Sequence, residues 1–196
     1  GAAIADEVSY LRGVCWLETG RAAEAVEALS QYLKAAARGR YADDALLKLA
    51  AAQAAAGRKD KARDAYERFL KEHPAHELAA QARYQLAELL FDLREFDKAC
   101  AVYEKLADPA SGSNWVAYAL FGQGLCRDEQ SRWADAIAAY DRLLAAPSGA
   151  DLAPQALYRK GRGLMKLQRW AEADAVLNDF LGRYSKHELS RAARIA

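Results

Sequence analysis

The feature that most constrains the fold of this 196-residue chain is an internal repeat with a period of 37 residues. The segment that begins at His76 recurs at His187, and the offset of 187 − 76 = 111 residues is three times 37. Stepping by 37 finds Ala at five equivalent positions: Ala25, Ala62, Ala99, Ala136 and Ala173. The sequence therefore predicts one structural unit repeated five times along the chain.

Each repeat has the composition of two α-helices. Ala occurs 46 times in the chain, whereas Val, Ile and Thr together occur only 10 times. Because Ala favours helices and β-branched residues favour strands, this composition excludes a fold built on sheets. The predicted first helices are 5–18, 41–56, 77–93, 114–130 and 152–168. The predicted second helices are 21–37, 59–72, 96–107, 133–145 and 170–184, and a partial helix begins near residue 188.

A small residue lies near the middle of every predicted first helix, at Gly13, Ala50, Ala87, Gly124 and Gly161. Gly inside a helix costs about 0.5–1 kcal/mol relative to Ala. A periodic Gly therefore predicts that another backbone approaches closely at this position. In the following turn, Gly20 and Gly57 are predicted to be the left-handed residues that end the helix.

The order of these residues resembles the tetratricopeptide repeat, with Gly124, Trp133, Ala136 and Tyr140 as the match in the fourth repeat. The resemblance implies an all-α fold: a right-handed superhelical solenoid of five helix–turn–helix repeats plus a partial C-terminal helix, as a single domain. The predicted repeats are 5–40, 41–76, 77–113, 114–150 and 151–187, followed by a partial helix over 188–196. We expect the chain to be part of a longer protein.

The period of 37 residues exceeds the usual period of about 34 residues, and the extra residues fall at the junction between repeats. The junction from Phe69 to Pro74 is similar to that of bacterial envelope proteins, such as outer-membrane-assembly lipoproteins and the Tol-Pal coordinator. This similarity favours a periplasmic or envelope location. Three cysteines without a predicted partner argue mildly for a reducing compartment instead.

Charge and motifs exclude several classes of function. The chain has 28 Lys and Arg and 27 Asp and Glu, so we predict no nucleic-acid surface. No apolar run approaches the roughly 20 residues of a membrane span, so direct membrane insertion is not predicted. His73 and His76 form an H-x-x-H pair in a predicted solvated loop, and Cys15, Cys100 and Cys126 are predicted to be small buried thiols. Neither set predicts a metal site, a cofactor or catalysis.

The predicted binding surface is the concave face that the first helices form in tetratricopeptide solenoids. Residues four and seven positions apart share one face of a helix. This spacing places rings at Tyr84, Phe121 and Tyr158, which either bury apolar side chains of a partner or pack between repeats. The full predicted site consists of Tyr84, Glu88, Phe91, Phe121, Leu125, Asp128, Tyr158, Arg159, Arg162, Met165 and Lys166.

The C-terminal end of this site is basic, because residues 155–169 contain five cations and no acid. We expect this end to bind an acidic peptide. The alternative is a solvated face with internal pairs such as Asp128 with Arg162. The sequence thus predicts a non-enzymatic scaffold that binds a protein or peptide segment. The alternative function is a structural module that self-associates through the ends of its solenoid, as a weak homo-oligomer.

Overall fold

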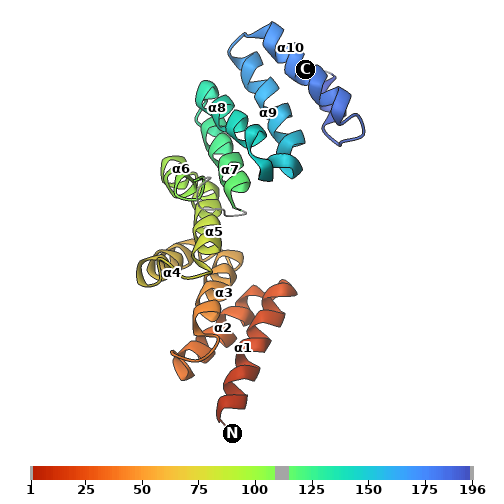
Figure 1. Cartoon of the computed structure of the whole chain (residues 1–196). Helices are drawn as coiled ribbons and strands as arrows, with labels where there is room; N and C mark the ends of the chain where they lie inside the picture. Colours follow the sequence, from red (N-terminus) through yellow and green to blue (C-terminus); the bar gives the residue numbers. More distant parts are fainter. Residues whose placement is uncertain (1, 109–114, 195–196) are drawn as a thin grey trace. The chain divides into compact units, whose positions relative to one another are not determined.

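The computed structural model describes residues 2–108 and 115–194, and every regular element within these residues is a helix (Figure 1). The chain divides into two compact units, residues 1–93 and 94–196. The first unit contains α1 (Ala2–Glu18), α2 (Ala22–Ala35), α3 (Ala42–Ala55), α4 (Lys59–Glu72) and α5 (Ala79–Asp92). The second contains α6 (Phe96–Glu104), α7 (Val116–Glu129), α8 (Trp133–Ala145), η2 (Pro147–Leu152), α9 (Ala153–Lys166), α10 (Trp170–Arg183) and α11 (Ser190–Ala193).

These boundaries agree with the prediction to within a few residues, and two differences have a clear cause. The helix α1 extends back to Ala2, because Ala2, Ala3 and Ala5 favour continued helix. The segment that begins at Pro147 was expected only to stop a helix, but it forms the 3-10 helix η2. Pro147 fits there because the first position of a helix requires no backbone N–H.

Packing within each unit runs between helices that are neighbours in sequence. In the first unit α2 packs on α1 and α3, α4 packs on α3 and α5, and α3 also contacts α1 and α5. In the second unit α7 packs on α6 and α8, while α9 packs on α8 and α10. This nearest-neighbour packing is typical of repeat proteins, because one helix pair cannot bury its own apolar face.

The small residues of the repeat lie at close helix contacts, as predicted. The prediction that a backbone approaches them is wrong, because the group nearest to each periodic glycine is a side chain. A Cβ atom added at Gly13 would lie 2.6 Å from Leu29 Cγ, and one at Gly161 would lie 2.6 Å from Leu177 Cδ2. At Gly124 it would overlap the Tyr140 ring. The first helix therefore needs a small residue wherever the second helix inserts a large one. The five periodic Ala residues of the second helices are at most 3% exposed.

The turn inside each helix pair holds a left-handed residue at the same position of every repeat. These residues are Gly20, Gly57, Arg94, Ser131 and Gln168, with φ between 57° and 75°. In the first turn the Arg21 N–H donates to the Trp16 carbonyl at 2.7 Å. This bond is the one that closes a Schellman motif at a helix C-terminus. The prediction for Gly20 and Gly57 is confirmed.

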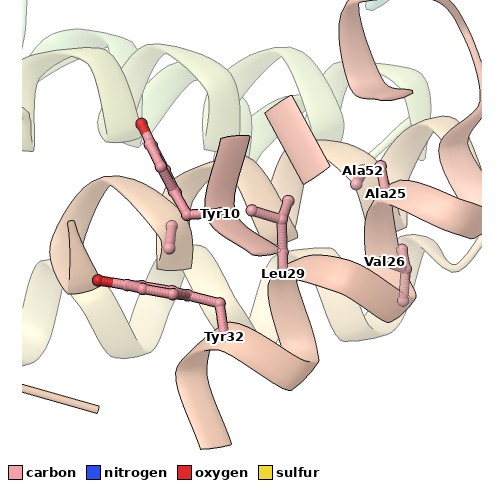
Figure 2. Packing of buried hydrophobic residues seen from close by; sticks show 7 residues of the cluster. Tyr10, Ala25, Val26, Leu29, Tyr32 and Ala52 are labelled. Carbon is pink, nitrogen blue, oxygen red and sulfur yellow. The ribbon is translucent and has the colours of Figure 1, made fainter. Parts of the chain in front are cut away.

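In the core of the first unit, the aromatic ring of Tyr10 on α1 packs against neighbouring helices. Tyr10 is 9% exposed and lies with Leu29 and Tyr32 in one apolar cluster (Figure 2). Its ring stacks on Tyr41, with ring centroids 4.5 Å apart. Its hydroxyl donates to Asp44 Oδ2 at 2.5 Å. In the first repeat, the aromatic residue of the first helix therefore packs between repeats.

Candidate functional site

Eight of the eleven predicted site residues lie on two helices of the second unit. Phe121, Leu125 and Asp128 lie on α7, and Tyr158, Arg159, Arg162, Met165 and Lys166 lie on α9. Both helices pack on α8. The other three, Tyr84, Glu88 and Phe91, lie on α5 in the first unit.

Asp128 is the most buried charge of the predicted site, with 12% of its side chain exposed. Its Oδ2 accepts a hydrogen bond from the Tyr140 hydroxyl at 2.7 Å and one from Arg159 Nη1 at 3.4 Å. Burial raises the pKa of Asp128, although Tyr140, Arg159 and Arg162 favour its charged form. The predicted pair of Asp128 with Arg162 is corrected, because the cation that reaches the carboxylate is Arg159.

Most of the predicted basic cluster is neutralised by local partners. Besides Arg159, Lys160 pairs with Asp141 at 2.6 Å. Arg169 pairs with Glu172, also at 2.6 Å. The two remaining cations are Arg162 and Lys166, which are exposed on α9.

Within the described parts of the chain, Arg162 and Lys166 have no hydrogen bond or ion pair. The Arg162 guanidinium carbon lies 5.9 Å from the centre of the Tyr158 ring. Lys166 follows Arg162 by four positions and therefore lies on the same face of the helix. These two side chains form an unpaired positive patch beside an aromatic ring.

Two hollows adjoin this patch. One, of about 130 Å³, is lined by both unpaired cations and by Asp128, Glu129, Trp133, Arg159 and Gly163. The other, of about 310 Å³, is lined by Tyr158, Met165 and Trp170 together with the same two cations. Trp170 is 61% exposed, which is unusual for a large apolar side chain. The predicted site omitted Trp133 and Trp170, although their spacing of 37 residues from each other marks them as equivalent.

Two rings of the site, Phe121 and Tyr158, pack on rings of the second helices. The Phe121 ring lies 6.0 Å from the Tyr140 ring, and the Tyr158 ring lies 6.2 Å from the Phe180 ring. Phe121 and Tyr158 are nevertheless only half-buried. Leu125 and Met165 are half-buried as well. These four side chains contribute to the core and still present apolar surface.

The H-x-x-H pair ties two elements together. His76 Nδ1 accepts a hydrogen bond from the Leu78 N–H at 3.1 Å, so in the neutral ring the proton is on Nε2. Nε2 in turn lies 3.1 Å from Asp43 Oδ2, and the ring packs edge-on against Phe69. The segment is a largely exposed loop, as expected, but the His76 side chain is held by these contacts and is only partly solvated. No group of three or more possible metal ligands occurs among the described residues.

Two further expectations from the sequence can be compared with the structure. Cys100 and Cys126 are buried as predicted, but Cys15 is exposed. Cys15 shares a face of α1 with Val8 and Leu11, which are about half exposed, so no helix of the first unit covers this face. Among the described helices, none has both the length and the apolar character of a membrane span.

Comparison with known families agrees with this geometry. Models described as tetratricopeptide repeat match residues 3–40, 44–76, 80–108, 116–153 and 155–187. The matches follow the five predicted repeats in order. No curated protein sequence matches the chain at a significant level.

Solved structures share the fold at low sequence identity. MamA from Desulfovibrio magneticus RS-1, from residue 41 to its end, gives a TM-score of 0.74 at 18% identity over 93% of this chain and 97% of that chain. A tetratricopeptide repeat protein from Parabacteroides merdae gives 0.77 at 17% identity over 99% and 72%. A putative kinesin light chain from Podosopora anserina gives 0.74 at 13% identity over 96% and 98%. Such likeness shows the fold alone.

Proposed function

Because the chain belongs to the tetratricopeptide repeat family, we propose that it is a protein-interaction scaffold and that α9 contributes the main contacts to a partner segment. The fold is typical of non-enzymatic scaffolds, and we propose no catalytic role. A fold of this kind hosts many different partners, so the nature of the partner has to be argued from the site.

The observation that carries this proposal is the pair of unpaired cations, Arg162 and Lys166. Several cations on other faces of the second unit have carboxylate partners, as Arg183 has in Asp179 at 3.1 Å. An acidic segment laid along α9 would meet two positive charges that form no ion pair with a carboxylate among the described residues. Charge complementarity of this kind raises association rates and selects partners.

The apolar lining next to the two cations supplies the second half of the proposed contact. Tyr158, Met165 and Trp170 line the hollow of about 310 Å³, which can hold a side chain of the partner. Aromatic residues and Arg contribute most of the binding energy in protein interfaces. We therefore propose a partner segment that has acidic residues flanking a large apolar residue. Tyr84, Glu88 and Phe91 on α5 are proposed as further contacts, to be tested separately.

The test is fluorescence anisotropy with a labelled peptide that has a central Phe between Glu residues. The same peptide with Lys in place of Glu serves as the comparison. We expect binding of the acidic peptide only, weakened by roughly tenfold by Arg162→Glu combined with Lys166→Glu, which corresponds to about 1.4 kcal/mol. Raising the salt concentration should weaken binding further.

The matched control is Arg183→Glu, which reverses an exposed cation on α10 away from the two hollows. This variant should bind the acidic peptide as tightly as the unchanged protein does. Equal binding of both peptides, or an equal effect of Arg183→Glu, would refute the proposed surface.

Self-association is a second candidate, supported by the apolar side chains that remain exposed. Val8 and Leu11 are 48% and 50% exposed on α1, and Trp170 is exposed on α10. Exposed apolar surface of this kind often marks an interface. Light scattering at increasing concentration tests the idea, and Leu11→Glu should keep the chain monomeric if α1 is involved. A mass that stays monomeric at every concentration would exclude this candidate.

An envelope location remains a prediction that depends on the 37-residue period and the junction sequence. In that case the partner would be another envelope protein. Expression of the tagged full-length protein in its own cells, followed by fractionation, tests this part of the proposal separately from peptide binding.

A further inference from the structure

The helices α6 and α7 pack antiparallel in a register that two contacts fix. At one end, the Tyr103 ring lies against Gly122, so closely that a Cβ at Gly122 would overlap it. At the other end, Asp97 Oδ1 accepts a hydrogen bond from Gln130 Nε2 at 2.9 Å. Because the helices are antiparallel, a residue one turn before Tyr103 on α6 lies opposite a residue one turn after Gly122 on α7.

Cys100 and Cys126 occupy the middle of this register. Cys100 lies three residues before Tyr103, and Cys126 lies four residues after Gly122. The Cys100 sulfur is 3.9 Å from the carbonyl oxygen of Gln123, which lies one turn before Cys126. The two thiols therefore face each other across the helix contact.

The environment of the pair distinguishes the two thiols. Cys126 is fully buried, whereas Cys100 is 5% exposed and lines a hollow of about 260 Å³. Arg127 and Arg132 line the same hollow. The pKa of Cys100 is lowered, first because the Cys126 thiol donates a hydrogen bond to it and then because these arginines are positively charged, although burial and the charge of Asp97 oppose the shift. A small oxidant that enters the hollow meets Cys100 first.

We propose that Cys100 and Cys126 are an oxidation-sensitive pair, which forms a disulfide between α6 and α7 when a hydroperoxide enters the hollow at Cys100. This inference is independent of the proposed binding function. It assigns Cys100 as the thiol that is oxidised first and Cys126 as the thiol that resolves the product.

The reaction has two balanced steps. The Cys100 thiolate attacks one peroxide oxygen, so that an S–O bond forms, the O–O bond breaks, and the departing oxygen takes a proton from water. The Cys126 sulfur then attacks the Cys100 sulfur, so that the S–S bond forms and the S–O bond breaks. The departing hydroxide and the Cys126 proton form water. The two thiols lose two electrons, and the hydroperoxide gains two.

The test uses the full chain, reduced and then treated with hydrogen peroxide. The protein is unfolded, its remaining thiols are alkylated, and peptides are identified by mass spectrometry without reduction. We expect one alkylated cysteine, Cys15, and one linked peptide pair that contains Cys100 and Cys126, about 2 Da lighter than the two thiols. Alkylation of all three cysteines, or links formed only through Cys15, would overturn the proposal.

Two variants assign the roles. Cys126→Ser should stop the reaction at a Cys100 sulfenic acid, which dimedone traps, whereas Cys15→Ser should leave the linked pair unchanged. A dimedone adduct at Cys100 in the unchanged protein, without any linked pair, would also overturn the proposal. The result on the unchanged protein decides the question even if Cys126→Ser does not fold.

Discussion

The two units build the same turn within their helix pairs from different residues. In the first unit the left-handed position is Gly20 and Gly57, and in the second it is Arg94, Ser131 and Gln168. The closing hydrogen bond is nevertheless the same: Arg21 donates to Trp16 in one unit and Arg132 to Arg127 in the other. The turn is therefore imposed by the packing and hydrogen bonding of the repeat. Gly lowers its cost but is not required.

The interiors of the helix pairs differ as well. Position 54 in the second repeat is Ala, and the equivalent position in the fourth repeat is Asp128. Tyr66, the equivalent of Tyr140, is buried and has its pKa raised by burial alone. Tyr140 donates to Asp128 instead. The fourth repeat thus has a buried polar pair where the second repeat has Ala54 and Tyr66, and equivalent substitutions test the difference.

The largest effect is expected at the small position of the first helix. Gly124→Ala should lower the free energy of unfolding by roughly 1–3 kcal/mol, because the Tyr140 ring is fully buried and cannot move away. At the equivalent position of the first unit, Ala50→Gly should cost only about 1 kcal/mol, through helix propensity. Urea unfolding measures both values. A stabilising Gly124→Ala would show that the ring adapts.

The next effect concerns the buried hydroxyls. Tyr140→Phe should cost about 1–2 kcal/mol, because it removes the hydrogen bond donor of a buried carboxylate. Tyr66→Phe should change stability by less than about 0.5 kcal/mol. Thermal unfolding of the two variants makes the comparison. Equal losses would mean that the Asp128 contact contributes no more than the ring itself.

A smaller pair of opposite effects is expected in the turns. Gly57→Ser places a residue with a Cβ in the left-handed region and should cost about 1 kcal/mol. Ser131→Gly relieves the same strain in the second unit and should gain about 0.5–1 kcal/mol. Urea titration of the single and double variants tests whether the two changes cancel. A loss of stability in Ser131→Gly would indicate that Ser131 contributes a contact that offsets its strain.

The smallest effect is a pH dependence that arises from Asp128 in the second unit. The raised pKa of Asp128 means that this group binds its proton more tightly in the folded chain than in the unfolded chain. Stability from this group therefore falls as the pH rises from the ordinary carboxyl value, about 3.9, through the raised value. Asp128→Asn should remove that fall. Unfolding midpoints between about pH 3 and 6 test this, with the exposed Asp60→Asn as the control.

The fold could be predicted from the sequence because the 37-residue repeat recurs at positions where the structure requires one kind of residue. The positions equivalent to Ala99 and Gly124 require a small residue in each repeat. The position equivalent to Gly57 has a left-handed backbone in each repeat. Arg94 and Gln168 could not be identified as left-handed from their type, and only their equivalence to Gly57 marks them.

The site was less predictable for a physical reason. Asp128 occupies a position that was predicted to line the concave face, where an acid would be solvated, whereas the structure pairs it with Tyr140, a residue of the next helix. The choice between Arg159 and Arg162 as its partner depends on how α9 is rotated on α8, which the repeat alone does not determine. That Cys100 and Cys126 face each other could not be predicted either, because it depends on the register between α6 and α7, which belong to two different repeats.

The packing of each helix on its sequence neighbours also determines how the chain would respond to force. Within a unit, successive helix contacts bear a stretching load in series, since few contacts bypass an intervening helix. A pulling experiment on either unit should therefore extend it in steps of one helix or one helix pair. The disulfide proposed above would prevent the step that separates α6 from α7, because it would hold these two helices together after the neighbouring contacts had opened.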